Sequence, residues 1–154
     1  MNALIFAFTR RGIDTARRVR EAVGGEIRVP RRLEAGDCPA YAGSLSDCVG
    51  AGFDRDALVF VGAAGIAVRA VAPFVSDKLS DPAVLCLDER GQYVVPLLSG
   101  HIGGANRLAR QIASALGATP VITTATDVNG RFSVDAWASE RGFAISDMAL
   151  AKRV

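Results

Sequence analysis

Three uninterrupted runs of apolar residues constrain the fold of this chain more than any other feature of its sequence. The runs are Ala3–Phe8, Ala57–Val61 and Ala83–Leu87. A run without polar alternation is typical of a strand that is buried on both faces, as in a parallel sheet covered by helices. Helical spacing separates the runs, for example over Ile13–Val23, where residues 13, 16, 19 and 23 are apolar. We therefore predict a three-layer, Rossmann-like α/β fold with a mostly parallel sheet.

The rest of the chain extends this alternation and adds one antiparallel hairpin. Tyr93–Leu98 is predicted as a strand, and the turn signal Asp88–Gly91 joins it to the apolar run before it. Further strands are predicted at Glu26–Val29, Val121–Thr124 and Phe143–Ile145, and further helices at Leu45–Val49, Ile66–Val75, Gly103–Leu116, Val134–Arg141 and from Asp147 onwards. The helix over residues 66–75 is apolar on most sides, so we expect it to be buried. The length predicts a single domain over residues 1–154.

Composition narrows the class of protein. Half of the residues are hydrophobic and the net charge is +2, which fits a globular domain. The three cysteines have no C-x-x-C spacing, which favours reduced thiols and a cytoplasmic location. Because the chain also has only one histidine, we expect no protein-bound metal. The sequence contains no run of about 20 apolar residues, so we expect no membrane span. No aromatic residues interleave the N-terminal arginines, so we expect no nucleic-acid partner.

The stretch Leu97–Asn106 holds the only histidine, His101, in a glycine-rich turn between a predicted strand and a predicted helix. Backbone N–H groups at such a turn, together with the positive end of the helix dipole, suit an anionic ligand. His101 is therefore a candidate for acid–base chemistry, and a purely structural histidine is the alternative. Ser99 has no second histidine and no patterned acid nearby in sequence, which argues against a serine-nucleophile triad.

Two further turns follow predicted strands. Gly62–Gly65 leads to Arg69, and Thr123–Asp127 follows the strand predicted over residues 121–124. Because ligands of open α/β sheets bind at the carboxyl ends of the strands, we expect both turns to share one rim with the His101 turn. The alternatives are glycines that serve only close packing, and an aspartate that bonds its own backbone in a turn.

Five separate strings share their order and spacing with one known family. They are Gly65–Pro73, Asp77-Lys78, Asp81–Val84, Leu97–Asn106 and Val121–Asp127. In these strings the chain resembles the CbiG family of cobalamin biosynthesis, over roughly residues 57–138. The resemblance implies a hydrolase that opens the lactone of cobalt-precorrin-5A, a ring-contracted cobalt macrocycle, and releases acetaldehyde to give cobalt-precorrin-5B. Family members carry a further C-terminal domain, which we expect this chain to lack.

The chemistry of individual residues fits the reaction that the resemblance implies, and we assign their roles as a hypothesis. The catalytic candidates are His101, Ser99 and Asp127, with His101 activating or orienting water; its rival role is axial ligation of the substrate cobalt. The expected substrate-binding residues are Gly62, Gly65, Arg69, Lys78, Gly100, Gly103, Gly104, Asn106, Thr123, Thr124 and Thr126. Among these, the amides of Gly103 and Gly104 are expected to receive an oxyanion or a carboxylate.

Arg69 and Lys78 are expected to pair with carboxylates at the edge of the macrocycle. No cofactor is expected, because the substrate carries the cobalt. Besides the cobalt-precorrin, the expected partners are a separate C-terminal domain or other enzymes of the pathway, and a homodimer is left open.

Two other functions remain as alternatives. The first is a non-catalytic corrinoid-binding or scaffold module that works with a separate C-terminal domain. The second is a generic nucleotide-binding domain, although the chain has no complete phosphate fingerprint and no patterned ribose-binding acid.

Overall fold

A computed structural model describes residues 1–129 and residue 143. In chain order the elements are β1 (Ala3–Ala7), α1 (Arg10–Val23), β2 (Glu26–Arg28), a 3-10 turn (Arg31–Leu33), α2 (Leu45–Ala51), β3 (Ala57–Val61), α3 (Ala64–Val71), β4 (Ala83–Leu87), β5 (Tyr93–Leu98), α4 (Ala105–Leu116), β6 (Thr119–Pro120) and α5 (Ala125–Val128). Three predicted elements lie outside the described residues, except for Phe143. They are the helix over residues 134–141, the strand over 143–145 and the helix from residue 147.

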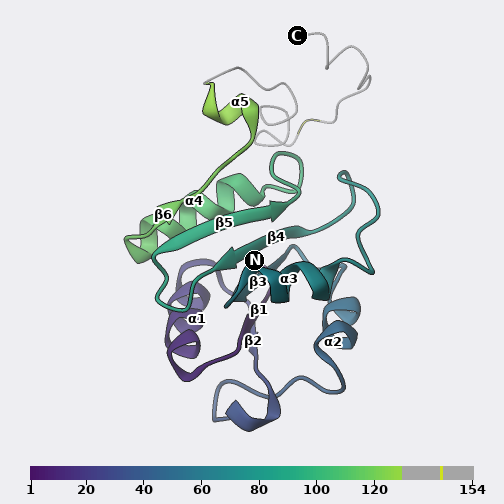
Figure 1. Cartoon of the computed structure of the whole chain (residues 1–154), viewed down its shortest axis with the longest axis vertical. Coiled ribbons are helices and arrows are strands. Elements are labelled where there is room, and N and C mark those ends of the chain that lie inside the picture. The colour runs from purple at the N-terminus through teal and green to yellow at the C-terminus, as the bar shows by residue number, and fades with distance from the viewer. Residues whose placement is uncertain (130–142, 144–154) are drawn as a thin grey trace.

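The strands form one sheet in the order β2-β1-β3-β4-β5-β6. Every neighbouring pair is parallel except β4 and β5, which pair antiparallel. Helices α1 and α4 cover one face, and α2 and α3 cover the other, so the sheet is the middle of three layers (Figure 1). The predicted fold class is thereby confirmed. No helix in the described part of the chain is long and apolar enough to cross a membrane.

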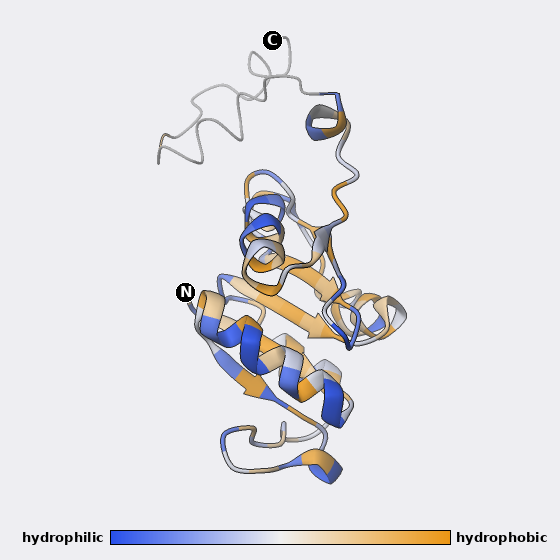
Figure 2. Cartoon of the chain, turned by 90° about the vertical axis from the view of Figure 1, so that its left-hand side faces the viewer, coloured by the Kyte–Doolittle hydropathy of each residue, from blue (hydrophilic) through white to orange (hydrophobic). Residues whose placement is uncertain are grey.

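The apolar runs lie at the centre of the sheet because both of their faces are covered. All residues of β1, β3 and β4 are buried. Alternate side chains point to opposite layers: Ile5 packs toward α1 and α4, whereas Phe6 packs toward α2 and α3 and stacks on Phe60 with ring centroids 4.9 Å apart. Figure 2 shows hydrophobic strands behind helices whose outer faces are hydrophilic.

Helices α1 and α4 begin at other residues than predicted, each for a local reason. Helix α1 begins three residues early because the Thr9 hydroxyl caps it by accepting a hydrogen bond from the Gly12 amide at 2.9 Å. Helix α4 begins at Ala105 because Gly104, at φ 77°, has a left-handed backbone that cannot belong to the helix. Helix α3 was predicted to be buried, but it is half exposed. Val68, for example, is 52% exposed.

The strand predicted after α4 is wrong in position. The sequence predicts Val121–Thr124, with Pro120 before it, but β6 is Thr119–Pro120. The amide of Thr119 donates to the carbonyl of Gln92, just before β5, and the amide of Val121 donates to that of Val94 in β5. The proline between them has no N–H to donate. A strand tolerates proline there because no described strand lies on its outer side.

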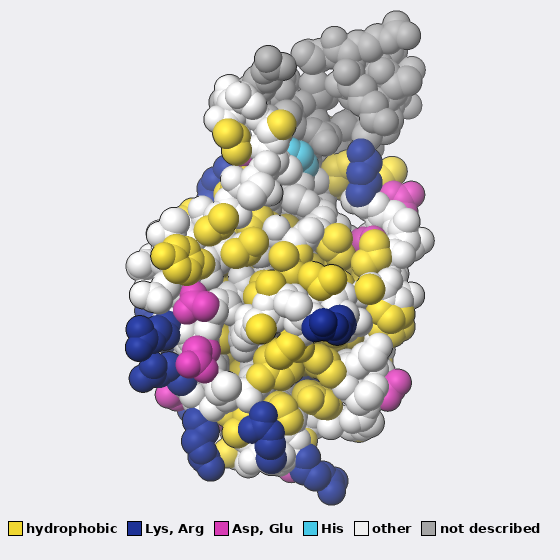
Figure 3. All heavy atoms as spheres, in the orientation of Figure 1, with side chains coloured by type: hydrophobic (Ala, Val, Ile, Leu, Met, Phe, Trp, Pro, Cys, Tyr) yellow, Lys and Arg dark blue, Asp and Glu magenta, His cyan; other side chains and the backbone are white. Residues whose placement is uncertain are grey.

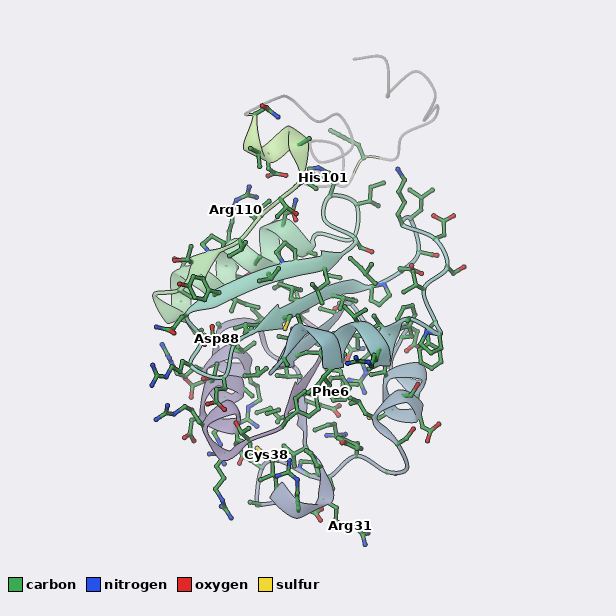
Figure 4. The ribbon with its side chains drawn as sticks, in the orientation of Figure 1. Phe6, Arg31, Cys38, Asp88, His101 and Arg110 are labelled. Carbon is green, nitrogen blue, oxygen red and sulfur yellow. The ribbon has the colours of Figure 1, made fainter. Side chains whose placement is uncertain are left out.

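The antiparallel hairpin decides which turns meet. Because β5 and β6 run opposite to β1, β3 and β4, their carboxyl ends lie at the other edge of the sheet. Figure 4 shows Asp88, at the end of β4, and His101, beyond the end of β5, far apart. The expectation of one shared rim is therefore wrong, and Gly62–Gly65 lies at the edge opposite the His101 turn.

Candidate functional site

The turn between β5 and α4 is closed by hydrogen bonds to its own carbonyl groups. The amide of Gly104 donates to the carbonyl of His101 at 3.1 Å, and the amide of Ala105 donates to that of Ser99, also at 3.1 Å. The amide of Asn106 donates to the carbonyl of Gly100 at 3.0 Å. The Gly104 amide, expected to receive an oxyanion, is therefore already used within the turn.

Gly103 and Ser99 pack against each other inside this turn. A Cβ at Gly103 would lie 2.4 Å from the Cβ of Ser99 and 3.0 Å from its carbonyl oxygen. Ser99 itself has φ 57°, an uncommon backbone for a residue other than glycine. Its hydroxyl donates to the carbonyl of Asp81 at 2.9 Å, which ties the turn to the loop before β4. These contacts favour a structural role for Ser99 over the nucleophilic one.

A buried polar network lies behind the turn. Asn106, only 4% exposed, donates through its side-chain amide to the Thr124 hydroxyl at 2.8 Å and to Asp127 Oδ2 at 2.9 Å. The Thr124 hydroxyl donates to the same carboxylate oxygen at 2.8 Å, and Arg110 forms an ion pair with the other oxygen. Asp127 thus connects α4 to the segment that follows β6, and its hydrogen bonds reach side chains rather than its own backbone.

The surroundings of Asp127 keep its carboxylate ionised. Burial by itself would raise the pKa, but the hydrogen bonds from Arg110 and Thr124, and the charge of Arg110, outweigh burial and hold the pKa of Asp127 below its ordinary value. His101 Nε2 lies 3.7 Å from Asp127 Oδ2, with the two side chains 20% and 17% exposed. A charged carboxylate therefore stands next to the only imidazole of the chain.

The imidazole opens into a small pocket of about 150 Å³. Its lining is Lys78, Ser99, Gly100, His101, Ile102 and Thr124. Such a volume is below the roughly 300 Å³ at which pockets begin to enclose a drug-sized molecule, so it accommodates one carboxylate or the edge of a larger ligand. Within the described residues, the Lys78 ammonium has no ion-pair partner. Figure 3 shows the histidine side chain reaching the surface of the molecule.

Several expected site residues lie elsewhere. Gly62 and Gly65 are at the opposite edge of the sheet, where Arg69 donates to the Gly65 carbonyl at 3.3 Å. Thr123 is exposed and does not line the pocket, and Thr126 belongs to α5 with a side chain outside the described residues. Gly103 and Gly104 line a separate, larger pocket on the other side of their turn.

Two residues that organise the site were missed at the sequence level. Arg110 follows Asn106 by four residues on α4, and this spacing places both on one face of the helix. Asp81 is buried, and its carboxylate accepts hydrogen bonds from the amides of Ser76 and Asp77 at 3.1 to 3.2 Å. The i, i+4 pair was visible in the sequence, whereas nothing there marked Asp81 as a loop anchor.

Metal-ligating side chains are scattered over the described part of the molecule. No three of its histidine, cysteine, aspartate and glutamate residues gather to hold a metal ion. Cys38, Cys48 and Cys86 are separate free thiols, and burial raises the pKa of Cys86 to about 11. The cysteines therefore add nothing to the His101 pocket.

Replacement of Gly103 by alanine tests the packing of the turn. The added Cβ would overlap Ser99, and we expect Gly103→Ala to lower the free energy of unfolding by about 1–3 kcal/mol in urea titrations. Gly65→Ala is the control, because its Cβ meets only the flexible end of Arg69 at 3.2 Å and alanine favours a helix. A G103A protein as stable as wild type would contradict the close packing.

Asp127→Asn tests the ionised carboxylate. A depressed pKa means that the charge stabilises the fold above about pH 4, the ordinary range, and that this contribution disappears as the pH falls through the pKa of the folded state. We expect the variant to be less stable than wild type at neutral pH, with the difference in unfolding free energy narrowing near pH 3. The exposed Asp54→Asn is the control, and a difference that does not change with pH would refute this description.

Comparison with known proteins relates this chain to one family. The profile of the family "Cobalamin synthesis G N-terminal" matches residues 48–127. A cobalt-precorrin-5A hydrolase from Salmonella typhimurium is 45% identical over 148 residues, covering 96% of this chain and 42% of that protein. A cobalt-precorrin-5A hydrolase from Priestia megaterium is 36% identical over 146 residues, covering 90% of this chain and 39% of that protein.

A solved structure supports the same relationship. The crystal structure of a cobalamin biosynthesis protein G homolog from Sulfolobus solfataricus superposes with a TM-score of 0.60 at 29% identity, over 89% of this chain and 39% of that one. The chain thus spans about two fifths of the length of the relatives it matches. The resemblance seen in the five strings is confirmed, and because the profile covers more than half of its residues, the chain belongs to the cobalamin synthesis G N-terminal family.

Proposed function

We propose that this chain is the N-terminal part of a cobalt-precorrin-5A hydrolase and contributes the residues that open the substrate lactone. Two relatives carry that name at 45% and 36% identity. The observation that carries the proposal is His101, held 3.7 Å from an ionised carboxylate in a pocket that also contains Lys78, which forms no ion pair with a described residue. A base, a group that stabilises its charged form, and a cation together suit ester hydrolysis.

In the proposed first step, His101 takes a proton from water as the oxygen of that water adds to the lactone carbonyl. The imidazole becomes positively charged, and Asp127 stabilises it across 3.7 Å. Arg110, Asn106 and Thr124 hold that carboxylate in place. The carbonyl electrons move onto oxygen, and Lys78, on the wall of the pocket, stabilises the resulting oxyanion.

In the second step the tetrahedral intermediate collapses. The bond between the acyl carbon and the ring oxygen breaks, and that oxygen receives the proton from the imidazolium, so His101 returns to its starting state. The new alcohol then loses its proton, the carbon–carbon bond to the macrocycle breaks, and acetaldehyde leaves while the macrocycle takes up the electron pair and a proton. The sequence consumes one water, and cobalt enters and leaves with the substrate, so the proposed reaction needs no cofactor.

The shape of the pocket favours the water role of His101 over ligation of cobalt. The imidazole is only 20% exposed, and the pocket holds about 150 Å³. An axial ligand must meet the face of a macrocycle, which a pocket of this size does not admit, whereas a peripheral lactone is small enough to enter. The free thiols fit the reducing cytoplasm, where we expect the protein to act.

The same volume supports a second candidate, a corrinoid-binding module without activity of its own. A pocket of about 150 Å³ covers only a small part of the ligand, and the relatives are more than twice as long as this chain. In that case the chain would anchor the substrate, and the remaining part of a full-length relative would complete the active site.

The test is release of acetaldehyde from cobalt-precorrin-5A by the purified chain and its variants. We expect turnover by wild type and a loss of about 100-fold or more in kcat for His101→Gln and His101→Ala, because the general base is removed. Arg31→Gln, at the opposite end of the molecule (Figure 4), is the control and should retain full activity.

Wild-type turnover in both His101 variants would end the catalytic assignment. Lost binding together with a changed absorption spectrum of the cobalt substrate would favour ligation instead. Substrate binding without acetaldehyde release by wild type would favour the binding module.

A further inference from the structure

The Ser99–Gly104 turn separates two pockets. Ile102 lines the pocket of His101, and the next residue, Gly103, lines a larger pocket of about 410 Å³. Adjacent residues are only 3.8 Å apart at Cα, so the two pockets are neighbours on the same edge of the sheet. The walls of the larger one include Asp56, Ala83 and the first turn of α4.

Among the described residues that line the larger pocket, Arg107 carries the only positively charged side chain. Its side chain folds back over the start of α4, where Nη2 lies 3.4 Å from the position a Cβ would take at Gly104. Within the part of the chain that the structure describes, the guanidinium has no ion pair and no hydrogen bond. Arg110, one turn further along the helix, contrasts with it because its charge is taken up by Asp127.

Lys78 and Arg107 therefore stand on the two sides of one turn, one in each pocket, and neither ammonium nor guanidinium is neutralised by a described acid. A small anion would meet one of them. A ligand with carboxylates spaced along its rim can meet both, because adjacent residues of one glycine-rich turn line the two pockets. The structure thus supplies, near His101, the second cation that the sequence had placed at Arg69.

We propose that the Arg107 pocket is a second anion subsite, which binds a peripheral carboxylate of a tetrapyrrole-type macrocycle while another edge of the ligand lies at Lys78 and His101. The subsite rests on the proposed function for its substrate class. An arginine fork bound to a carboxylate fixes direction as well as position. Arg107 would therefore decide which edge of the macrocycle faces the imidazole.

Replacement of Asp56 should change the affinity for an anionic ligand in the opposite direction to replacement of Arg107. It lines the same pocket, and its Oδ2 accepts a hydrogen bond from the Asn2 amide at 2.8 Å. Its negative charge opposes a carboxylate ligand in that pocket. Asparagine at this position keeps an oxygen for the Asn2 amide and removes the charge, so Asp56→Asn should strengthen binding where Arg107→Gln weakens it.

Equilibrium dialysis of the purified chain against uroporphyrin, a metal-free tetrapyrrole with acetate and propionate groups on its rim, tests the subsite. Loss of a charged hydrogen bond predicts binding about tenfold weaker for Arg107→Gln. Asp56→Asn should bind about twofold more tightly. Lys78→Gln should also weaken binding, and the exposed control Arg31→Gln should bind as wild type does.

Arg107→Gln binding as tightly as wild type would overturn the subsite, and so would an equal loss in Arg107→Gln and Arg31→Gln, because the effect would then be general charge. A wild-type chain that does not bind uroporphyrin would overturn it as well. Acetaldehyde release by wild type and the His101 variants decides the proposed function separately, so the two failures are distinguishable.

Discussion

The antiparallel pairing of β4 with β5 is the constraint on which the rest of this molecule depends. Asp88 closes the hairpin by accepting hydrogen bonds from the amides of Arg90, Gln92 and Tyr93 at 2.8 to 2.9 Å. This turn reverses the direction of β5, and β6 then pairs parallel to β5 through α4. The carboxyl ends of the last two strands, with His101 and Asp127 beyond them, are thereby moved to the edge where β1, β3 and β4 begin.

This reversal separates the candidate site from the place where α/β sheets usually bind ligands. The strand order reverses between β1 and β3, and ligands commonly lie at the carboxyl ends of such strands. Here that edge holds Thr9 and the Gly62–Gly65 turn. The buried polar network and the two pockets with Lys78 and Arg107 lie at the other edge. The parallel β–α–β unit built from β5, α4 and β6 thus carries the candidate site.

Apolar patterning predicted most of the fold because it reports burial directly. The bounds of β3 and β4 agree with the sequence, since continuous apolar runs end where both faces stop being covered. The bounds of β5 agree as well, although this strand is only partly buried. Patterning was less reliable where backbone geometry decides. The left-handed Gly104 delays α4, and Pro120 is tolerated at an edge strand, and neither effect changes the hydrophobic period.

The candidate site was predicted only in part. His101, Asn106, Thr124 and Asp127 come together as expected, because the order of the strands and helices that carry them was predicted, although the bounds of β6 and α4 were not. Arg69 was misplaced because its position depends on strand direction. Arg107 and Arg110 are separated by less than one helical turn, and only the structure distinguishes the cation that faces a pocket from the one bound to Asp127.

The central claim is that the macrocycle binds at the edge of the His101 turn. The most direct measurement is an amide NMR titration of the isotope-labelled chain with uroporphyrin. We predict that the signals of Lys78 and of residues 99–107 shift most strongly, with those of Thr124 and Asp127. Shifts concentrated instead at residues 9–12 and 62–65 would place the ligand at the opposite edge and contradict this account.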